Sequence, residues 1–224
     1  MKKYIISLLA ACVFLPSCSL DEKLFTYVAE DGYITDASSA RTVLYGLYRN
    51  LCNQTLYGCN LSMAFDMPTD LTKADGFQLV GGRVFTCNAH DPSFATVENT
   101  WEYLYKTIFN ANDFIEKVSA AKERLSAQDS EVVDVYVAEA RVIRALMYFE
   151  LLRNWKNITL ITTTEQSRQL SSTYVQDKPE DVYRFIELEL KEAAEVLPWA
   201  KADNLRPDNA YMVSKASALG LLAR

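Results

Sequence analysis

Residues 129–154 read DSEVVDVYVAEARVIRALMYFELLRN, and apolar side chains recur in this run at steps of three and four. That spacing places them on one face of a helix, which is the pattern of a helix that packs against a core. We therefore predict a long amphipathic helix over this range. Its expected inward residues are Val132, Tyr136, Ala140, Ile143, Met147 and Leu151.

A second long helix is predicted just before it, over residues 93–118, with Ser93 as the N-cap. Such a helix would be about 39 Å long. Trp101 and Tyr105 fall on its apolar face, so we expect both to pack in the core. Because the interval at 119–128 is short, the two helices should form an antiparallel hairpin.

Further helices are predicted on either side of this hairpin. One begins at Asp36, a favourable N-cap, and runs to residue 51. Another follows Asp177-x-x-Glu180, which has the form of a capping box, and a last one begins at Asn209. The two helix pairs begin about 80 to 85 residues apart, which is typical of a helical repeat. The predicted fold class is all-α.

The N-terminus has the pattern of an export signal. Two lysines precede an apolar run at 4–14, which is shorter than the roughly 20 residues that a membrane-spanning helix needs. The LPSC that ends at Cys18 has the order of a lipobox, so residues 1–17 are predicted to be a lipoprotein signal peptide. Cys18 would carry acyl chains such as palmitate, and the polar, acidic residues 18–35 would form a lipidated tether. An ordinary cleaved signal with a chance cysteine is the alternative.

Composition narrows the possible functions. The net charge of −6 argues against a nucleic-acid partner. The chain has a single histidine, and it lacks a phosphate-binding glycine loop and the common hydrolase and metalloprotease motifs. We therefore expect no catalysis, no metal and no cofactor. Cys52, Cys59 and Cys87 are expected to be buried free thiols.

Four segments together resemble the SusD/RagB family of outer-membrane nutrient-binding lipoproteins, and they cover most of the chain in the family's order. The segments are Trp101-x3-Tyr105-x2-Ile108-x3-Asn112-x2-Ile115, Ala138-Glu139-Ala140-Arg141-x2-Arg144-Ala145-x2-Tyr148-Phe149-x-Leu151, Lys191-Glu192-Ala193-Ala194-Glu195-x-Leu197-Pro198 and Ser214-Lys215-Ala216-x-Ala218-Leu219-x-Leu221-Leu222-Ala223-Arg224. One departure follows the second segment. The family often has a Tyr-Gly-Pro-type turn there, whereas this chain has Trp155-Lys156-Asn157-Ile158.

The resemblance implies a tetratricopeptide-like (SusD-like) scaffold over residues 36–224, with a loop-rich insert at about 53–92. It also implies a lipid-anchored, surface-exposed protein of the cell outer membrane. Such a protein binds glycans or other oligomeric nutrients and delivers them to a SusC-like TonB-dependent transporter. Family members are considerably longer, and the last helix reaches Arg224 without a stop signal, so we expect that the chain is truncated at its C-terminus.

For the ligand site, the resemblance directs attention to aromatic rings, because sugars stack their C–H faces on them. The candidates in the insert are Phe77, Phe85, His90 and Asp91. The alternative is that the two phenylalanines fill gaps between the insert and the scaffold.

Two arginines in the second of the four segments can be interpreted in two ways. Arg141 and Arg144 are either ligand contacts or, as we expect, partners of Glu139 or nearby carboxylates that hold the hairpin together. The acidic run at 187–192 is expected to be solvated helix surface.

Other functions stay open at this point. A lipid-anchored helical-repeat adaptor would bind protein partners in its concave groove. A lipid-anchored enzyme without a recognised motif and a non-functional truncated SusD-like copy are the remaining alternatives.

Overall fold

The computed structural model describes residues 32–75, 82–169, 171–200 and 211–224. Regular structure within these ranges is entirely helical, without a strand, which confirms the predicted all-α fold. The chain divides into two units, residues 1–33 and 34–224, and helices α2 to α9 all belong to the second. The predicted signal peptide, Cys18 and most of the predicted tether lie outside the described residues.

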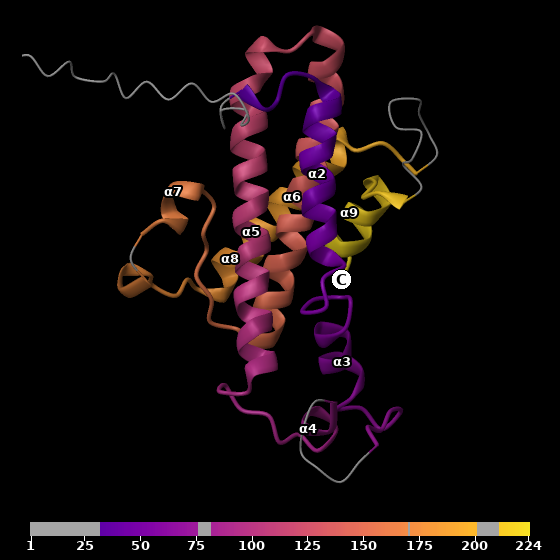
Figure 1. The fold of residues 1–224 in the computed structure, drawn as a ribbon, viewed down its shortest axis with the longest axis vertical. Helices are drawn as coiled ribbons and strands as arrows, with labels where there is room; N and C mark the ends of the chain where they lie inside the picture. The colour runs from indigo at the N-terminus through magenta and orange to yellow at the C-terminus, as the bar shows by residue number, and fades with distance from the viewer. Residues whose placement is uncertain (1–31, 76–81, 170, 201–210) are drawn as a thin grey trace, which may run out of the picture. The chain divides into compact units, whose positions relative to one another are not determined.

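The central feature is the predicted hairpin of two long antiparallel helices (Figure 1). Helix α5 spans Ala95–Ala121 and α6 spans Ala127–Trp155, and the short 3-10 helix η2 (Lys122–Arg124) lies between them. Helix α2 (Ala37–Leu51) runs alongside both. Leu44, Ala111 and Ile143 bring the three helices into one hydrophobic cluster.

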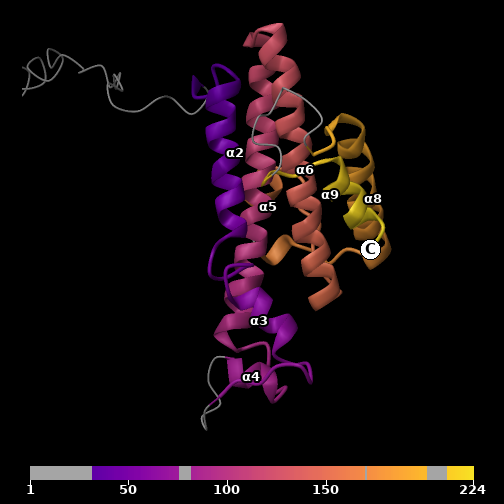
Figure 2. The ribbon, with the colours of Figure 1, turned by 90° about the vertical axis from the view of Figure 1, so that its right-hand side faces the viewer.

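A second helix pair packs on the other side of α6 (Figure 2). It consists of α8 (Pro179–Val196) and α9 (Lys215–Leu222). Leu151 of α6 and Leu190 of α8 belong to a second hydrophobic cluster that joins this pair to the hairpin. Stacked helix pairs that each bury a face on the next are the tetratricopeptide-like arrangement. Because α6 lies between the two clusters, it is buried on more than one face.

Helix starts were predicted with mixed success. Asp36 caps α2 as expected, since its carboxylate accepts a hydrogen bond of 2.7 Å from the Ser39 N–H. The capping box at Asp177 and Glu180 is wrong, because Lys178 is the N-cap of α8 and the Asp177 carboxylate accepts the Leu160 N–H at 2.7 Å instead. Ser93 is likewise not the N-cap of α5.

The remaining boundaries differ by a few residues. Phe94 is the N-cap of α5, and Ser93 donates its hydroxyl to Asp91 at 2.6 Å. Ser126 caps α6, three residues before the predicted start. Asn209 lies outside the described residues, and α9 begins only at Lys215.

The predicted loop-rich insert contains two short helices, α3 (Asn60–Asp66) and α4 (Gly82–Thr86). The predicted burial of the thiols is wrong for two of three, because Cys52 and Cys87 are exposed and Cys59 is half-buried. All three are free. None of the helices in the described part of the chain has the length and apolar character needed to cross a membrane.

Candidate functional site

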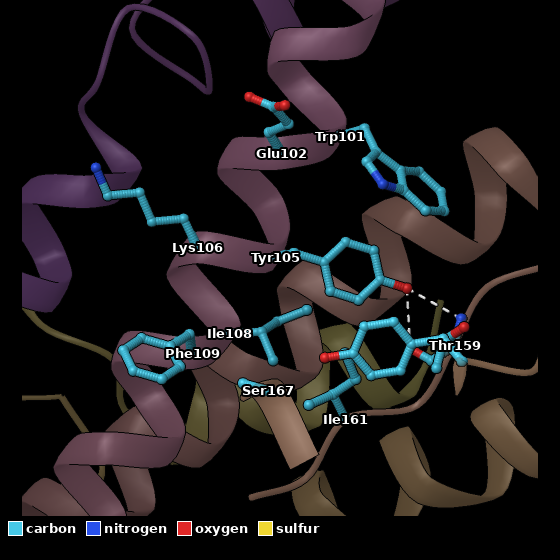
Figure 3. A pocket seen from close by; sticks show the side chains of 10 residues that line it. Trp101, Glu102, Tyr105, Lys106, Ile108, Phe109, Thr159, Ile161 and Ser167 are labelled. Atoms are coloured by element: carbon cyan, nitrogen blue, oxygen red, sulfur yellow. Dashed lines mark hydrogen bonds between the residues drawn. The ribbon is translucent and has the colours of Figure 1, made fainter. Parts of the chain in front are cut away.

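A groove of about 520 Å³ lies between α5 and the polypeptide that follows α6 (Figure 3). The wall formed by α5 is rich in aromatic and charged side chains, and the opposite wall comes from residues 159–174. The lining residues are Trp101, Glu102, Tyr105, Lys106, Ile108, Phe109, Thr159, Ile161, Ser167 and Tyr174.

Aromatic rings dominate the α5 wall of this groove. The rings of Trp101 and Tyr105, one helical turn apart, have centroids 5.0 Å apart. Trp155, at the end of α6, meets Trp101 edge-on with a centroid distance of 5.2 Å. Trp101 and Tyr105 do pack against the core as predicted, but both are only half-buried and also line the groove.

The opposite wall is held in place by the Tyr105 hydroxyl. This hydroxyl donates to the Thr159 carbonyl at 2.9 Å and accepts the Thr159 N–H at 3.0 Å (Figure 3). Burial, with a smaller contribution from the charge of Asp177, raises the pKa of Tyr105 to about 12. The neutral hydroxyl therefore bridges α5 to the segment that connects α6 to α7 (Thr164–Ser167), which we call the connecting segment (residues 156–163).

A second tyrosine holds the same segment two residues further on. The hydroxyl of buried Tyr148 donates to the Ile161 carbonyl and accepts the Ile161 N–H, both at 2.7 Å. The Asn112 amide of α5 also donates to the Ile161 carbonyl, at 3.0 Å. Burial raises the pKa of Tyr148 above its ordinary value, so this hydroxyl also stays neutral.

We call each pair of hydrogen bonds from one tyrosine hydroxyl to one backbone residue a tyrosine clamp. Arg144 connects the Tyr148 clamp to the second helix pair. Its guanidinium donates to the Asn112 side-chain oxygen at 2.7 Å and to Glu189 of α8 at 2.8 and 2.5 Å. Arg141 also pairs with Glu189 at 2.8 Å and with Glu192 at 2.5 Å. Charge pairs of this kind are costly to bury unless their hydrogen bonds are satisfied, as they are at Arg144.

The arginines therefore pair with carboxylates as predicted, but they join α6 to α8 and α5. Their partner is Glu189 rather than Glu139, which accepts the Tyr48 hydroxyl of α2. The prediction that the acidic run is solvated is wrong at Glu189, which is buried. Glu189 follows Ile186 by three residues and precedes Ala193 by four, so helix spacing places it on the buried face of α8, where α6 packs.

The comparisons with known proteins agree with this architecture. Residues 62–224 match the SusD-like family described as "Starch-binding associating with outer membrane". The chain belongs to the SusD-like family. It is 26% identical over 164 residues to SusD-like protein P25 of Formosa agariphila, covering 69% of this chain and 30% of that one.

Solved SusD-like structures give the same result. The chain superposes on a SusD homologue from Bacteroides thetaiotaomicron with a TM-score of 0.82 and 38% identity, over 86% of this chain and 36% of the other. A laminarin-binding SusD-like protein gives a TM-score of 0.63 and 25% identity, over 83% and 38% respectively. This chain thus spans little more than a third of the length of these SusD-like structures.

The ligand candidates of the insert that the structure describes do not line the groove. Phe85 is buried, with its ring centroid 5.3 Å from that of exposed His90, and both line a smaller hollow of about 150 Å³ together with Trp155. The Asp91 carboxylate accepts hydrogen bonds from Ser93 and is exposed. Phe77 lies outside the described residues.

The groove was not predicted from the sequence. Aromatic residues at every fourth position of α5 predict a buried face equally well, and the second wall comes from residues 50 or more positions away. Among the described residues there is no group of three histidine, cysteine or acidic side chains that would hold a metal ion.

Proposed function

We propose that this SusD-like chain captures glycans at the outer membrane without transforming them, and that the groove beside α5 contributes to glycan binding. The observation that carries the proposal is the aromatic wall of Trp101 and Tyr105 in a member of this family. The laminarin-binding relative has the same fold at 25% identity. Because this chain spans only part of its relatives' length, the proposal concerns the contribution of this part.

The chemistry of the groove suits a sugar chain. A half-exposed indole beside a phenol ring offers an apolar surface for the C–H face of a pyranose, worth about 0.5 to 1.5 kcal/mol per stacked ring. Glu102 and Lys106 lie on the same wall, and Ser167 on the opposite one, where they can bond hydroxyl groups. The two tyrosine clamps fix the walls before a ligand arrives, which reduces the entropy lost on binding.

The wider proposal includes an anchor and a partner. Acylated Cys18 would hold the domain at the outer membrane, exposed at the cell surface, and captured glycan would pass to a SusC-like TonB-dependent transporter. The candidates Phe85 and His90 would add contacts from the smaller hollow, with Asp91 beside them in the chain. Trp155 lines this hollow and its ring contacts Trp101 of the groove. Mass spectrometry of the mature N-terminus and protease shaving of intact cells test the anchor and the exposure. An unmodified Cys18, or a domain that proteases cannot reach, would contradict this part of the proposal.

Glycan binding is tested by calorimetry of the purified chain with β-glucan oligosaccharides. Trp101→Ala should weaken binding by about 3- to 10-fold, which corresponds to the loss of one stacked ring. Trp199→Ala is the matched control, because Trp199 is exposed and does not line the groove. Equal affinities of the two variants would overturn the role of the groove, and turnover of any glycan would overturn the non-catalytic assignment.

A further inference from the structure

A second, polar hollow of about 530 Å³ lies where the end of α2 faces α5. Its lining residues are Gly46, Arg49, Asn50, Cys52, Asn53, Gln54 and Tyr103. Tyr103 is two residues from both Trp101 and Tyr105, so its side chain leaves α5 on the opposite face. The hollow is therefore distinct from the aromatic groove.

The charge in this hollow is positive, against the overall charge of −6. Arg49 is exposed, no carboxylate lines the hollow, and Arg49 has no ion pair within the described residues. Lys106 lines the aromatic groove instead, but its ammonium group lies 5.2 Å from the centroid of the Tyr103 ring. A guanidinium group and an aromatic ring that line one hollow are suited to a flat, oxygen-rich ligand that carries negative charge.

Amide groups supply the remaining polar surface. Three of the seven lining residues are Asn50, Asn53 and Gln54. The side-chain nitrogen of Asn50 is buried and lacks a hydrogen-bond acceptor within the described part of the chain. Leaving a buried donor unpaired is costly, so an acceptor that reaches this amide would relieve the cost.

Gly46 leaves the hollow open on the α2 side. A Cβ atom built there would meet no atom within 4 Å. A larger side chain at this position would thus extend into open space without a clash, and it would replace the poorest helix former after proline.

We propose that this hollow is a second glycan subsite, which accepts a sugar residue that carries a carboxylate or a sulfate group. Arg49 recognises the charge, the three amides bond ring hydroxyls, and Tyr103 contacts the apolar face of the sugar. The inference rests on the proposed glycan-binding function and narrows its substrate class to acidic glycans.

The first test compares three probes by calorimetry on the purified chain: an oligouronate, a sulfated oligosaccharide and a neutral β-glucan oligosaccharide. Arg49→Gln should weaken the acidic probes at least about 10-fold and change the neutral probe less than twofold. Whichever acidic probe binds more tightly identifies the charged group. Arg49→Gln binding every probe as the parent does would overturn the subsite.

A steric variant and its control make the test independent of charge. Gly46→Leu should occupy part of the hollow and weaken binding of the acidic probes at least about 10-fold. Gly220→Leu in α9 should have no effect, because the Cβ position at Gly220 is equally open and lies away from the hollow. Circular dichroism should show both variants folded. Unchanged binding by Gly46→Leu would overturn the proposal.

Thiol labelling locates the probe directly. Cys52 lines the hollow and is exposed, and Cys87 is an exposed free thiol elsewhere. A bound acidic probe should slow maleimide modification of Cys52 at least about threefold, by steric exclusion, and leave Cys87 unchanged. If a neutral glucan binds in a Trp101-dependent way while acidic probes protect nothing, this inference fails and the proposed function stands. If no glycan binds at all, both fail.

Discussion

Two tyrosine clamps hold the connecting segment, and they differ in what surrounds them. Tyr148 and Tyr105 each bridge the N–H and the carbonyl of one residue, Ile161 and Thr159 respectively. The Tyr148 clamp, which we call the inner clamp, is buried and continues through Asn112 into a charged network. The Tyr105 clamp, which we call the outer clamp, is half-buried and forms part of the groove wall.

The difference separates the scaffold from the surface that meets ligands. In the inner clamp, Arg144 bonds both Glu189 and Asn112, and the Asn112 amide and the Tyr148 hydroxyl both donate to the Ile161 carbonyl. Their role is to fix where the connecting segment runs. In the outer clamp only one hydroxyl is used, and the aromatic faces beside it are left for another molecule. The family segment with Arg144 and Tyr148 therefore describes architecture, whereas the segment with Asn112 also contains the groove rings of Trp101 and Tyr105.

The largest effect should come from removing the cation of the inner clamp. Arg144→Ala removes the hydrogen bonds from Arg144 to buried Glu189 and Asn112 and leaves only Arg141 to pair with Glu189, which should lower the free energy of unfolding by about 3 kcal/mol. Arg184→Ala is the control, because the Arg184–Asp181 pair is exposed and should contribute less than about 0.5 kcal/mol. Urea denaturation followed by circular dichroism measures both. Similar values for the two variants would show that the network does not hold the scaffold.

The next largest effect compares the clamps themselves. Tyr148→Phe removes a buried hydroxyl that serves both polar groups of Ile161, and should cost about 1 to 3 kcal/mol. Tyr105→Phe should cost less, about 1 kcal/mol, because water can reach part of the Thr159 backbone. The same denaturation experiment reports both values. The opposite order would mean that the groove wall, and not the buried network, fixes the connecting segment.

The sequence predicted the inner region far better than the outer one. The recurrence of apolar residues at steps of three and four depends only on local helix geometry, so α5 and α6 were predicted close to their true extents. Burial of Glu189 depends on where α8 packs on α6, and the Asp177 carboxylate bonds Leu160, 17 positions away. Local patterns carry no information about such partners. The groove was missed for the same reason, because one of its walls follows α6.

A pH titration should sharpen the comparison at the outer clamp. The folded chain keeps the Tyr105 proton up to a pKa of about 12, whereas the unfolded chain loses it near the ordinary value of 10. The unfolded state then binds fewer protons, so stability should fall as the pH rises from 10 to 12, by up to about 2 kcal/mol from this residue. Tyr105→Phe should flatten that part of the stability curve relative to the parent chain. A variant with the same pH slope as the parent would show that Tyr105 titrates normally in the folded state.

The smallest effect should come from the turn that leads into both clamps. Lys156 has φ 64° and ψ −60°, and the Asn157 N–H donates to the Trp155 carbonyl at 2.7 Å, which together define a classic γ-turn. This conformation strains a residue with a Cβ by about 1 to 3 kcal/mol, whereas glycine adopts it freely at a cost in unfolded-state entropy of about 0.5 to 1 kcal/mol. Lys156→Gly should therefore raise the free energy of unfolding by about 1 kcal/mol.

The neighbouring position provides the control for this turn. Asn157 does not have a positive φ, so Asn157→Gly has no strain to relieve and should lower stability slightly, by about 0.5 kcal/mol. Both effects are measured by urea denaturation, and glycan affinity at the groove should stay within twofold of the parent. If Lys156→Gly were destabilising, the strain would be absent and the Lys156 side chain would have a role in holding the connecting segment. Contacts of the Lys156 side chain would then compensate for the lysine at the position where the family often has a glycine. This compensation would be local, because the tyrosine clamps hold Thr159 and Ile161, which lie further along the connecting segment.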